Sequence, residues 1–512
     1  MTLKADAAKT ARGTLGFVVQ NSANSLLGLL LFAVFARFVT KSEMGVYAGF
    51  SFTITLFQTL GILGLNVAAP RFVAKLLAEG ERGSASAVAR TIIFLSLGAG
   101  GLLAMIHYLL ASRFSFLLSG TPDYALHFTV ASAVILVFVP MLVLEGLMQG
   151  VQEYGRLATL RVAAQVVRII VSVWLLLNGW GLIGMIVGWT ILGLLVGVCS
   201  VLFLGCHLDL GSGLYPPGSI LRYSLPLLGA ALVVFLSNNI DIFIVITEGS
   251  PTDLGAYNVA VTASGALTTI LIASASATLL PAMSAHFGAG GLAGVERVFY
   301  RATRYLTLLC TPAALGLASL AWPAIWIMGG PAYRDSAPSL TIISISFLAY
   351  VLSTPIMISL QAVGETGRVL VVAVAATAVC SLFSAALFPI LGIEGAALGR
   401  ASLFASTLVI GLYESGKVVK LRFDLEALWK SFTASLLMAS AVYITGSAGV
   451  SWVNIPAGVL LGAAIYTVTL RLLGAVKRED VDVLRRILPS RFKGLSETME
   501  SVLTRLLVQT GD

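Results

Sequence analysis

The sequence is poor in charge. Only 11% of its 512 residues are Asp, Glu, Lys or Arg, whereas 58% are hydrophobic, and the mean hydropathy is +0.95. A soluble globule of this length has too little interior to hide so much apolar surface. The net charge is +8, but the basic residues are spread over short connectors between apolar runs, which favours lipid headgroups over nucleic acid as their partners. The composition therefore predicts a polytopic membrane protein that binds no nucleic acid.

The motifs of metal, nucleotide and enzyme chemistry are also missing. The four cysteines lack paired metal-binding spacing and lie in or beside apolar runs, which favours packing residues over ligands. No Gly-x-x-x-x-Gly-Lys-Ser/Thr motif is present, so this chain is not expected to hydrolyse a nucleotide. Asp480 and Asp482 have the spacing of a glycosyltransferase metal motif, but no nucleotide-binding domain surrounds them. We expect no enzyme activity, cofactor or metal, and an ion gradient, a membrane potential or removal of product would have to drive transport.

Long apolar runs fill most of the chain. Each is close to the roughly 20 residues that a helix needs to cross the hydrocarbon core. We expect fourteen transmembrane helices, at about 13–38, 45–68, 88–110, 125–150, 157–178, 182–205, 222–247, 254–280, 302–328, 336–362, 367–390, 393–415, 427–447 and 452–473.

Lys and Arg are distributed unequally between the two sides of these spans. Of the 32 basic residues, 26 fall on the side of the N-terminus, two lie inside spans (Arg168 and Arg400), and four fall on the other side. Cytoplasmic loops are the ones enriched in Lys and Arg. The distribution predicts a multi-pass protein of the cytoplasmic membrane with both termini in the cytoplasm.

The chain also contains an internal repeat. Glu43–Tyr47 recurs as Asp253–Tyr257 at an offset of 210, and Met148–Arg156 recurs as Leu360–Arg368 at an offset of 212. An offset of six helices, an even number, keeps both copies in the same orientation, as in parallel-repeat transporters. We therefore expect an N-terminal six-helix lobe (1–221), a C-terminal six-helix lobe (222–415), two extra helices (416–474) and a cytoplasmic amphipathic tail (475–512).

Three short segments carry a family resemblance. Ala36–Tyr47 is similar to a junction between the first two helices, Asn238–Asp241 followed by Gly255–Tyr257 to a junction between helices 7 and 8, and Gln149–Arg156 to a connector between helices 4 and 5. Together with the parallel repeat, they resemble the multidrug/oligosaccharidyl-lipid/polysaccharide exporter superfamily, and within it the flippases of the polysaccharide-biosynthesis branch. Val39 departs from the leucine usual in that family.

The resemblance implies a transporter that flips a lipid-linked oligosaccharide, a glycan on polyprenyl or dolichyl diphosphate, by alternating access. Its implied partners are this substrate, membrane lipids and glycan-assembly enzymes. Two alternatives stay open, namely a cation-coupled multidrug antiporter of the same superfamily and a non-transporting scaffold for glycan-synthesis enzymes. The first helix contains no acid, which disfavours the antiporter, and a scaffold has no reason to bury Arg168 or Asp241.

A diphosphate headgroup requires a polar, cationic path through the membrane. Arg161, Gln165 and Arg168 follow one face of the predicted fifth helix, and Arg400 lies in the twelfth. We interpret these four residues as substrate-binding; for Arg168 and Arg400, pairing with an acid or a backbone carbonyl is the alternative. Asn21, Asn24 and Asn258 lie on polar faces of the first and eighth helices, where hydrogen bonding between helices is equally consistent.

Four further residues are candidates for gating or coupling. Asp241 and Asn238 interrupt an apolar run, where an ionisable group costs on the order of 3 kcal/mol and normally faces a protein interior or a watery cavity. Arg37 is expected at the same depth as Asp241, so we expect these two residues to pair. Glu145, near the end of the fourth helix, is either a functional acid or a side chain that reaches the interface.

Overall fold

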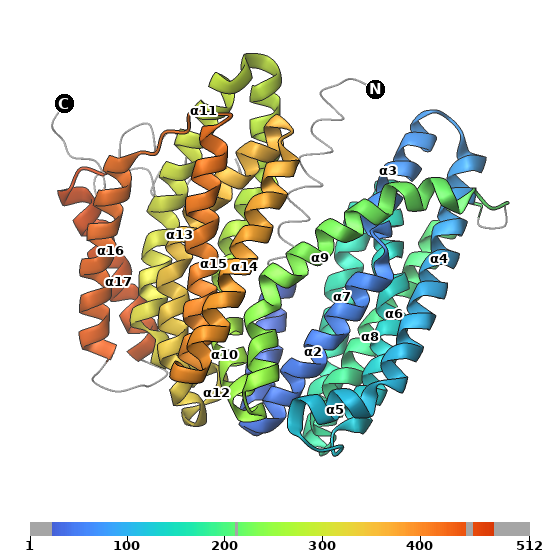
Figure 1. Cartoon of the computed structure of the whole chain (residues 1–512), viewed down its shortest axis with the longest axis horizontal. Helices are drawn as coiled ribbons and strands as arrows, with labels where there is room; N and C mark the ends of the chain where they lie inside the picture. Colours follow the sequence, from blue (N-terminus) through green and yellow to red (C-terminus); the bar gives the residue numbers. More distant parts are fainter. Residues whose placement is uncertain (1–22, 210–212, 447–453, 476–512) are drawn as a thin grey trace, which may run out of the picture. The chain divides into compact units, whose positions relative to one another are not determined.

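The computed structural model describes residues 23–209, 213–446 and 454–475. This part of the chain is helical and contains no β-strand (Figure 1). Within it, eleven helices are long and apolar enough to cross a membrane, or twelve if the bent pair Thr278–Ser319 and Ala321–Gly329 forms one span. The predicted all-α, polytopic membrane protein is confirmed. Asn21 and residues 476–512 of the predicted tail lie outside the described residues.

The helices follow the predicted spans closely in most of the chain. The helix Ala23–Phe38 is apolar but shorter than the 18 residues or more of the candidate membrane spans. The remaining elements are α2 (Lys41–Ile62), α3 (Leu65–Ala78), α4 (Arg82–Leu109), α5 (Ala111–Ser119), α6 (Ala125–Gly150), α7 (Tyr154–Leu177), α8 (Gly181–Gly205), α9 (Pro217–Glu248), α10 (Pro251–Leu267), η1 (Thr268–Ile272), α11 (Ala273–Ser319), α12 (Ala321–Gly329), η2 (Pro331–Ser336), α13 (Ala337–Val363), α14 (Thr366–Leu391), α15 (Ile393–Gly416), α16 (Leu425–Gly446) and α17 (Asn454–Leu472).

The predicted span at 254–280 is interrupted in the structure, because it passes through α10, the π-helical turn η1 and the start of α11. Beyond this span, α11 is broken at Gly290 and Gly291, and Gly291 has a φ of +59°, which glycine adopts readily. Hydropathy alone does not register a π-turn, because the turn changes the hydrogen-bonding pattern and not the apolar composition.

The chain groups into two compact units. Among the described residues, the first contains 23–209, 213–277, 328–336 and 373–403, and the second contains 278–327, 337–372, 404–446 and 454–475. Helices α14 and α15 each contribute residues to both units. The lobe boundaries expected at 221 and 415, and the extra status of 416–474, stay predictions.

Helix α6 lies at the centre of the first unit. Two-thirds of its most apolar window is buried (67%), more than in any other candidate span of the described chain. His107 of α4 ties it to α2, because its two ring nitrogens lie 2.9 Å from the hydroxyl of Ser132 on α6 and 3.1 Å from that of Thr53 on α2. Both polar atoms of this buried ring are thereby satisfied, and α2, α4 and α6 are held in register.

Helices α2 and α3 are two halves of one broken span. Leu63 and Gly64, which separate them, have left-handed backbone conformations with φ of 53° and 71°. A Cβ atom on Gly64 would lie 2.3 Å from the carbonyl oxygen of Ser224 on α9. Glycine is therefore needed both for the turn and for the close approach of α9.

The second unit contains a buried ion pair near the start of α16. Arg304 of α11 donates from Nη1 to Asp424 at 2.7 Å and from Nη2 to the carbonyl of Ala475 at 2.9 Å. Burial opposes ionisation of the carboxyl group, but the Ala427 N–H and the Arg304 guanidinium together lower the pKa of Asp424. The pair fixes the start of α16 against α11.

The repeated motif recognised in the sequence begins two corresponding helices. Thr40 caps α2 and Ser250 caps α10, and each forms a capping box with the acid three residues later, Glu43 and Asp253 respectively. The two copies therefore fold into the same local structure.

These two helices also pack against each other in a reciprocal way. A Cβ atom on Gly45 of α2 would lie 1.8 Å from the carbonyl oxygen of Pro251, and a Cβ atom on Gly255 of α10 would lie 2.0 Å from that of Lys41. Each copy of the motif thus supplies the glycine that admits the backbone of the other copy. Small residues at such contacts are typical of helix packing in membranes.

We predict that Gly45→Ala and Gly255→Ala each destabilise the protein by about 1–3 kcal/mol, because the added methyl group displaces backbone. Thermal unfolding of the purified protein in detergent measures this effect. Gly265→Ala in α10 is the matched control, since a Cβ atom there meets nothing within 4 Å. Equal melting temperatures for Gly255→Ala and Gly265→Ala would contradict the proposed packing.

Candidate functional site

A cavity of about 470 Å³ opens within the first compact unit. It contains the polar face predicted for the fifth helix, here α7, so the structure brings Arg161, Gln165 and Arg168 together with Asn24. We call it the arginine cavity. Its lining residues are Asn24, Ser25, Gly28, Ile54, Thr55, Gln58, Phe138, Arg161, Gln165, Arg168, Trp189, Leu192 and Thr269.

Arg168 is the cation of this cavity that lacks an acidic partner. Its guanidinium lies over the ring of Trp189, 5.1 Å from the centroid, and Nη1 is 3.4 Å from the side-chain oxygen of Gln165. Its Nε is buried without a hydrogen-bond acceptor, and no carboxylate in the described part of the chain forms an ion pair with it. A cation held by an aromatic face and one weak amide contact keeps most of its donors for another acceptor.

Arg161 lies about two helical turns before Arg168 on α7, and its charge is neutralised within the protein. Its Nε and Nη2 donate to the two oxygens of Glu145 on α6 at 2.5 and 2.7 Å. This two-pronged geometry is the strongest arrangement for a guanidinium and a carboxylate. Glu145 is therefore a partner of Arg161 and does not reach the interface, and the positive charge predicted for Arg161 is offset.

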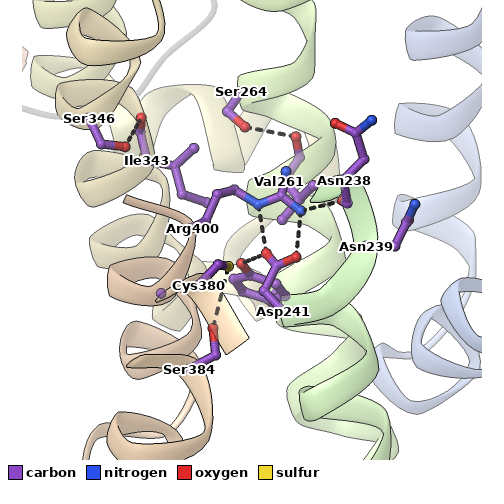
Figure 2. Close-up of polar contacts among 12 residues, drawn as sticks. Asn238, Asn239, Asp241, Val261, Ser264, Ile343, Ser346, Cys380, Ser384 and Arg400 are labelled. Atoms are coloured by element: carbon purple, nitrogen blue, oxygen red, sulfur yellow. Dashed lines mark hydrogen bonds and ion pairs between the residues drawn. The ribbon is translucent and has the colours of Figure 1, made fainter. Parts of the chain in front are cut away.

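The third intramembrane arginine, Arg400 of α15, forms a second buried pair (Figure 2). It donates to both oxygens of Asp241 on α9, with Nε–Oδ2 at 2.6 Å and Nη2–Oδ1 at 2.9 Å, and also to the carbonyl oxygen of Asn238 at 3.0 Å. The hydroxyl of Tyr257 on α10 donates to the same carboxylate. The side chains of Arg400 and Asp241 are only 11% and 2% exposed, so this cluster joins α9, α10 and α15.

The expected pairing of Asp241 with Arg37 is wrong. Arg37 is exposed, whereas Asp241 is 1% exposed and is held by Arg400 and Tyr257. The prediction compared the depths of two residues along their helices. It did not include which helix faces α9, and that neighbour comes from a segment 159 residues away.

The structure does not bring all the other predicted residues to the arginine cavity. Asn24 lines it, and both polar atoms of its amide are buried without a partner among the described residues. Asn258 of α10 is partly buried and is not among the lining residues. The Asn238 side chain lines a second cavity.

Three contributing residues were not predicted. Gln58 and Trp189 line the arginine cavity, and Tyr257 completes the Asp241 cluster. Tyr257 carried a signal, because it occupies the position of Tyr47 in the repeat and follows a buried acid by sixteen residues. Trp189, a tryptophan in an apolar run, carries no such signal in the sequence. Only its neighbours in space distinguish a cavity-lining tryptophan from one that packs in the core.

Comparisons with known proteins identify relatives of the whole chain. Residues 34–338 match the family described as "Polysaccharide biosynthesis protein". The chain is 24% identical to Stage V sporulation protein B of Bacillus subtilis (strain 168), over 93% of this chain and 97% of that protein.

Solved structures show the same fold. The lipid II flippase MurJ in an inward closed conformation matches with a TM-score of 0.75 and 14% identity, over 89% of this chain and 98% of that one. An inward-facing multidrug resistance MATE family transporter of the MOP superfamily matches with a TM-score of 0.61 and 14% identity, over 83% and 96%. At these identities the likeness is one of fold.

We predict that Asp241→Asn lowers the free energy of unfolding by about 3 kcal/mol, because it leaves the Arg400 charge buried and unpaired. The double variant Asp241→Leu, Arg400→Leu should recover most of that loss, because it removes both charges. Chemical denaturation in detergent measures the three proteins.

Asp335→Asn is the matched control for this experiment. Asp335 is paired with Lys41 at 2.7 Å but is 53% exposed, and exposed pairs contribute at most about 1 kcal/mol. A double variant as unstable as Asp241→Asn would show that packing, and not charge, makes the cluster important.

Proposed function

Because the chain belongs to the polysaccharide biosynthesis protein family, within the multidrug/oligosaccharidyl-lipid/polysaccharide exporter superfamily of transporters, we propose that it flips a lipid-linked oligosaccharide across the cytoplasmic membrane. The substrate is a glycan on polyprenyl or dolichyl diphosphate, and transport proceeds by alternating access with both termini in the cytoplasm. Glycan-assembly enzymes supply the substrate and consume the product, and membrane lipids surround its hydrocarbon tail.

One observation carries this proposal: Arg168 lies in a cavity of the membrane-spanning region without an acidic partner among the described residues. A cation in the membrane is costly unless a counter-charge or water compensates it. The two other arginines predicted to bind substrate, Arg161 and Arg400, already have carboxylate partners. An incoming phosphate would thus supply the counter-charge that Arg168 lacks.

Amide groups around Arg168 favour the same ligand. Gln58, Gln165 and Asn24 line the cavity beside it, and the Asn24 amide has no partner in the described chain. Amide N–H groups donate to phosphate oxygens, and buried polar atoms are normally satisfied. An anion at Arg168 would accept hydrogen bonds from side chains of more than one helix.

A cation-coupled multidrug antiporter is the second candidate, favoured by the fold shared with MATE transporters. The arrangement of acids disfavours it. Glu145 and Asp241, which would have to attract a cation, are each bound by an arginine. Efflux of a cationic dye from cells would support the antiporter. A scaffold for glycan-synthesis enzymes, in contrast, would transport neither the dye nor the lipid after reconstitution into membranes.

We predict that Arg168→Ala lowers the rate of lipid-linked oligosaccharide flipping in proteoliposomes by about tenfold or more, the effect of losing a charge-assisted hydrogen bond of roughly 1.5–3 kcal/mol. Arg168→Lys should retain part of the activity, since it keeps the charge but not the planar donors. Arg301→Ala is the control, because Arg301 is an exposed arginine of α11 outside the cavity. Full activity of Arg168→Ala would refute the proposed anion site.

We predict further that a phosphatase reporter fused to the C-terminus stays inactive in cells and that a fluorescent reporter at the same position is active. The excess of Lys and Arg on the side of the termini is the physical reason. An active phosphatase fusion would reverse the proposed orientation.

A further inference from the structure

A second cavity of about 410 Å³ lies in the first compact unit between α2, α3 and α9. It is lined by Thr55, Thr59, Ile62, Gly64, Asn66, Val67, Leu227, Ala231, Val234, Phe235, Asn238 and Asn239. We call it the asparagine cavity. None of these lining residues is charged, although five of them are polar.

The polar groups of α9 present acceptors to this cavity. The side-chain amide nitrogen of Asn238 donates to the carbonyl of Val234 at 3.0 Å, and that of Asn239 donates to the carbonyl of Phe235 at 2.9 Å. A carbonyl can only accept, so these bonds fix the NH₂ side of each amide toward the helix. The two side-chain oxygens accept no hydrogen bond from the described residues.

The hydroxyl groups of α2 behave in the same way. Thr55 donates to the carbonyl of Ser51 at 2.7 Å, and Thr59 donates to that of Thr55 at 2.8 Å. Each hydroxyl hydrogen is thereby used, and the oxygen lone pairs remain. The two threonines thus offer only acceptors, whereas each asparagine amide keeps its oxygen and one N–H.

This polarity selects the chemistry of the ligand. A phosphate is an anion, and no cation lines this cavity to compensate its charge. A ligand cation would require an acid, and no carboxylate lines the cavity; Asp241 lies on the side of α9 away from Asn239 and is held by Arg400 (Figure 2). Neutral hydroxyl groups both donate and accept hydrogen bonds, so they match the four free oxygens and the remaining amide N–H groups.

The asparagine cavity adjoins the arginine cavity, because Thr55 lines both. The first offers acceptors without charge, and the second offers the unpaired cation Arg168. A ligand that spans them has a polyhydroxylated neutral part next to an anionic part.

We propose that the asparagine cavity is the glycan subsite of this transporter, in which Asn238, Asn239, Thr55 and Thr59 accept hydrogen bonds from sugar hydroxyl groups while the adjoining phosphate lies at Arg168. This inference rests on the proposed function and adds where, and by which polarity, the sugar is recognised. The break between α2 and α3 at Leu63 and Gly64 forms part of one wall of this cavity. Gly64 lines the cavity, and its missing side chain allows α9 to approach closely.

Binding of two probes to the full-length protein in lipid nanodiscs tests the subsite. The probes are polyprenyl diphosphate carrying N-acetylglucosamine and the same polyprenyl diphosphate without sugar. The wild type is expected to bind the glycosylated probe more tightly. The double variant Asn239→Leu, Thr59→Val should lower that preference by about tenfold and leave the affinity for the bare lipid unchanged, because it removes two acceptors worth roughly 0.5–1.5 kcal/mol each.

Matched controls separate recognition from folding. Thr159→Val with Asn178→Leu removes the same two kinds of side chain, which make the same bonds to their own helix (3.0 Å to the carbonyl of Gly155 and 2.8 Å to that of Trp174) but lie outside both cavities. This control and Thr59→Ser should both keep the wild-type preference.

The outcomes distinguish this inference from the proposed function. Equal wild-type affinity for the two probes, or an equal loss for both in Asn239→Leu, Thr59→Val, would overturn the glycan subsite. If Arg168→Ala still weakened the bare lipid in that case, the anion site and the proposed transport would stand. Failure of the wild type to bind either probe would overturn both.

Discussion

The first compact unit is organised by the need to compensate positive charge inside a membrane. Three arginines project into it, and two are matched by carboxylates at hydrogen-bonding distance, Arg161 by Glu145 and Arg400 by Asp241. Each matched pair links two helices and adds no net charge to the interior. Arg168 is left with an aromatic face and an amide. Of these three arginines, Arg168 alone lines a cavity without a carboxylate partner among the described residues, and we propose that the substrate is recognised there.

The sequence predicted the helical class, most span positions and the polar face of α7, because each depends on residues close together in the chain. It also identified the three arginines and two acids that matter. Which acid pairs with which arginine was not predictable. Asp241 and Arg400 lie 159 residues apart, and helix depth alone is compatible with several partners. The asparagine cavity escaped prediction for a related reason, since the direction of an amide depends on the backbone carbonyl that it meets.

The asparagine cavity is polar although no charged residue lines it. A threonine or asparagine in an apolar run is commonly interpreted as a contact between helices. Here the threonine O–H groups and one N–H of each asparagine amide are spent on carbonyls of the same helix, and the remaining oxygens of α2 and α9 belong to residues that line a shared cavity. Thr55 lines both cavities, so the proposed anion site and the proposed glycan subsite adjoin within one compact unit.

The contact between α2 and α10 has a consequence for how the duplicated halves can evolve. Gly45 and Gly255 each face main-chain atoms of the other copy. Where two side chains are in contact, a larger residue at one position can be accommodated by a smaller residue at the other. A peptide carbonyl cannot be replaced by a smaller group in this way. Compensatory substitution is therefore closed at both positions, and the two copies of the motif cannot drift independently there. A substitution at either glycine therefore requires a shift of the facing backbone and not only of a side chain.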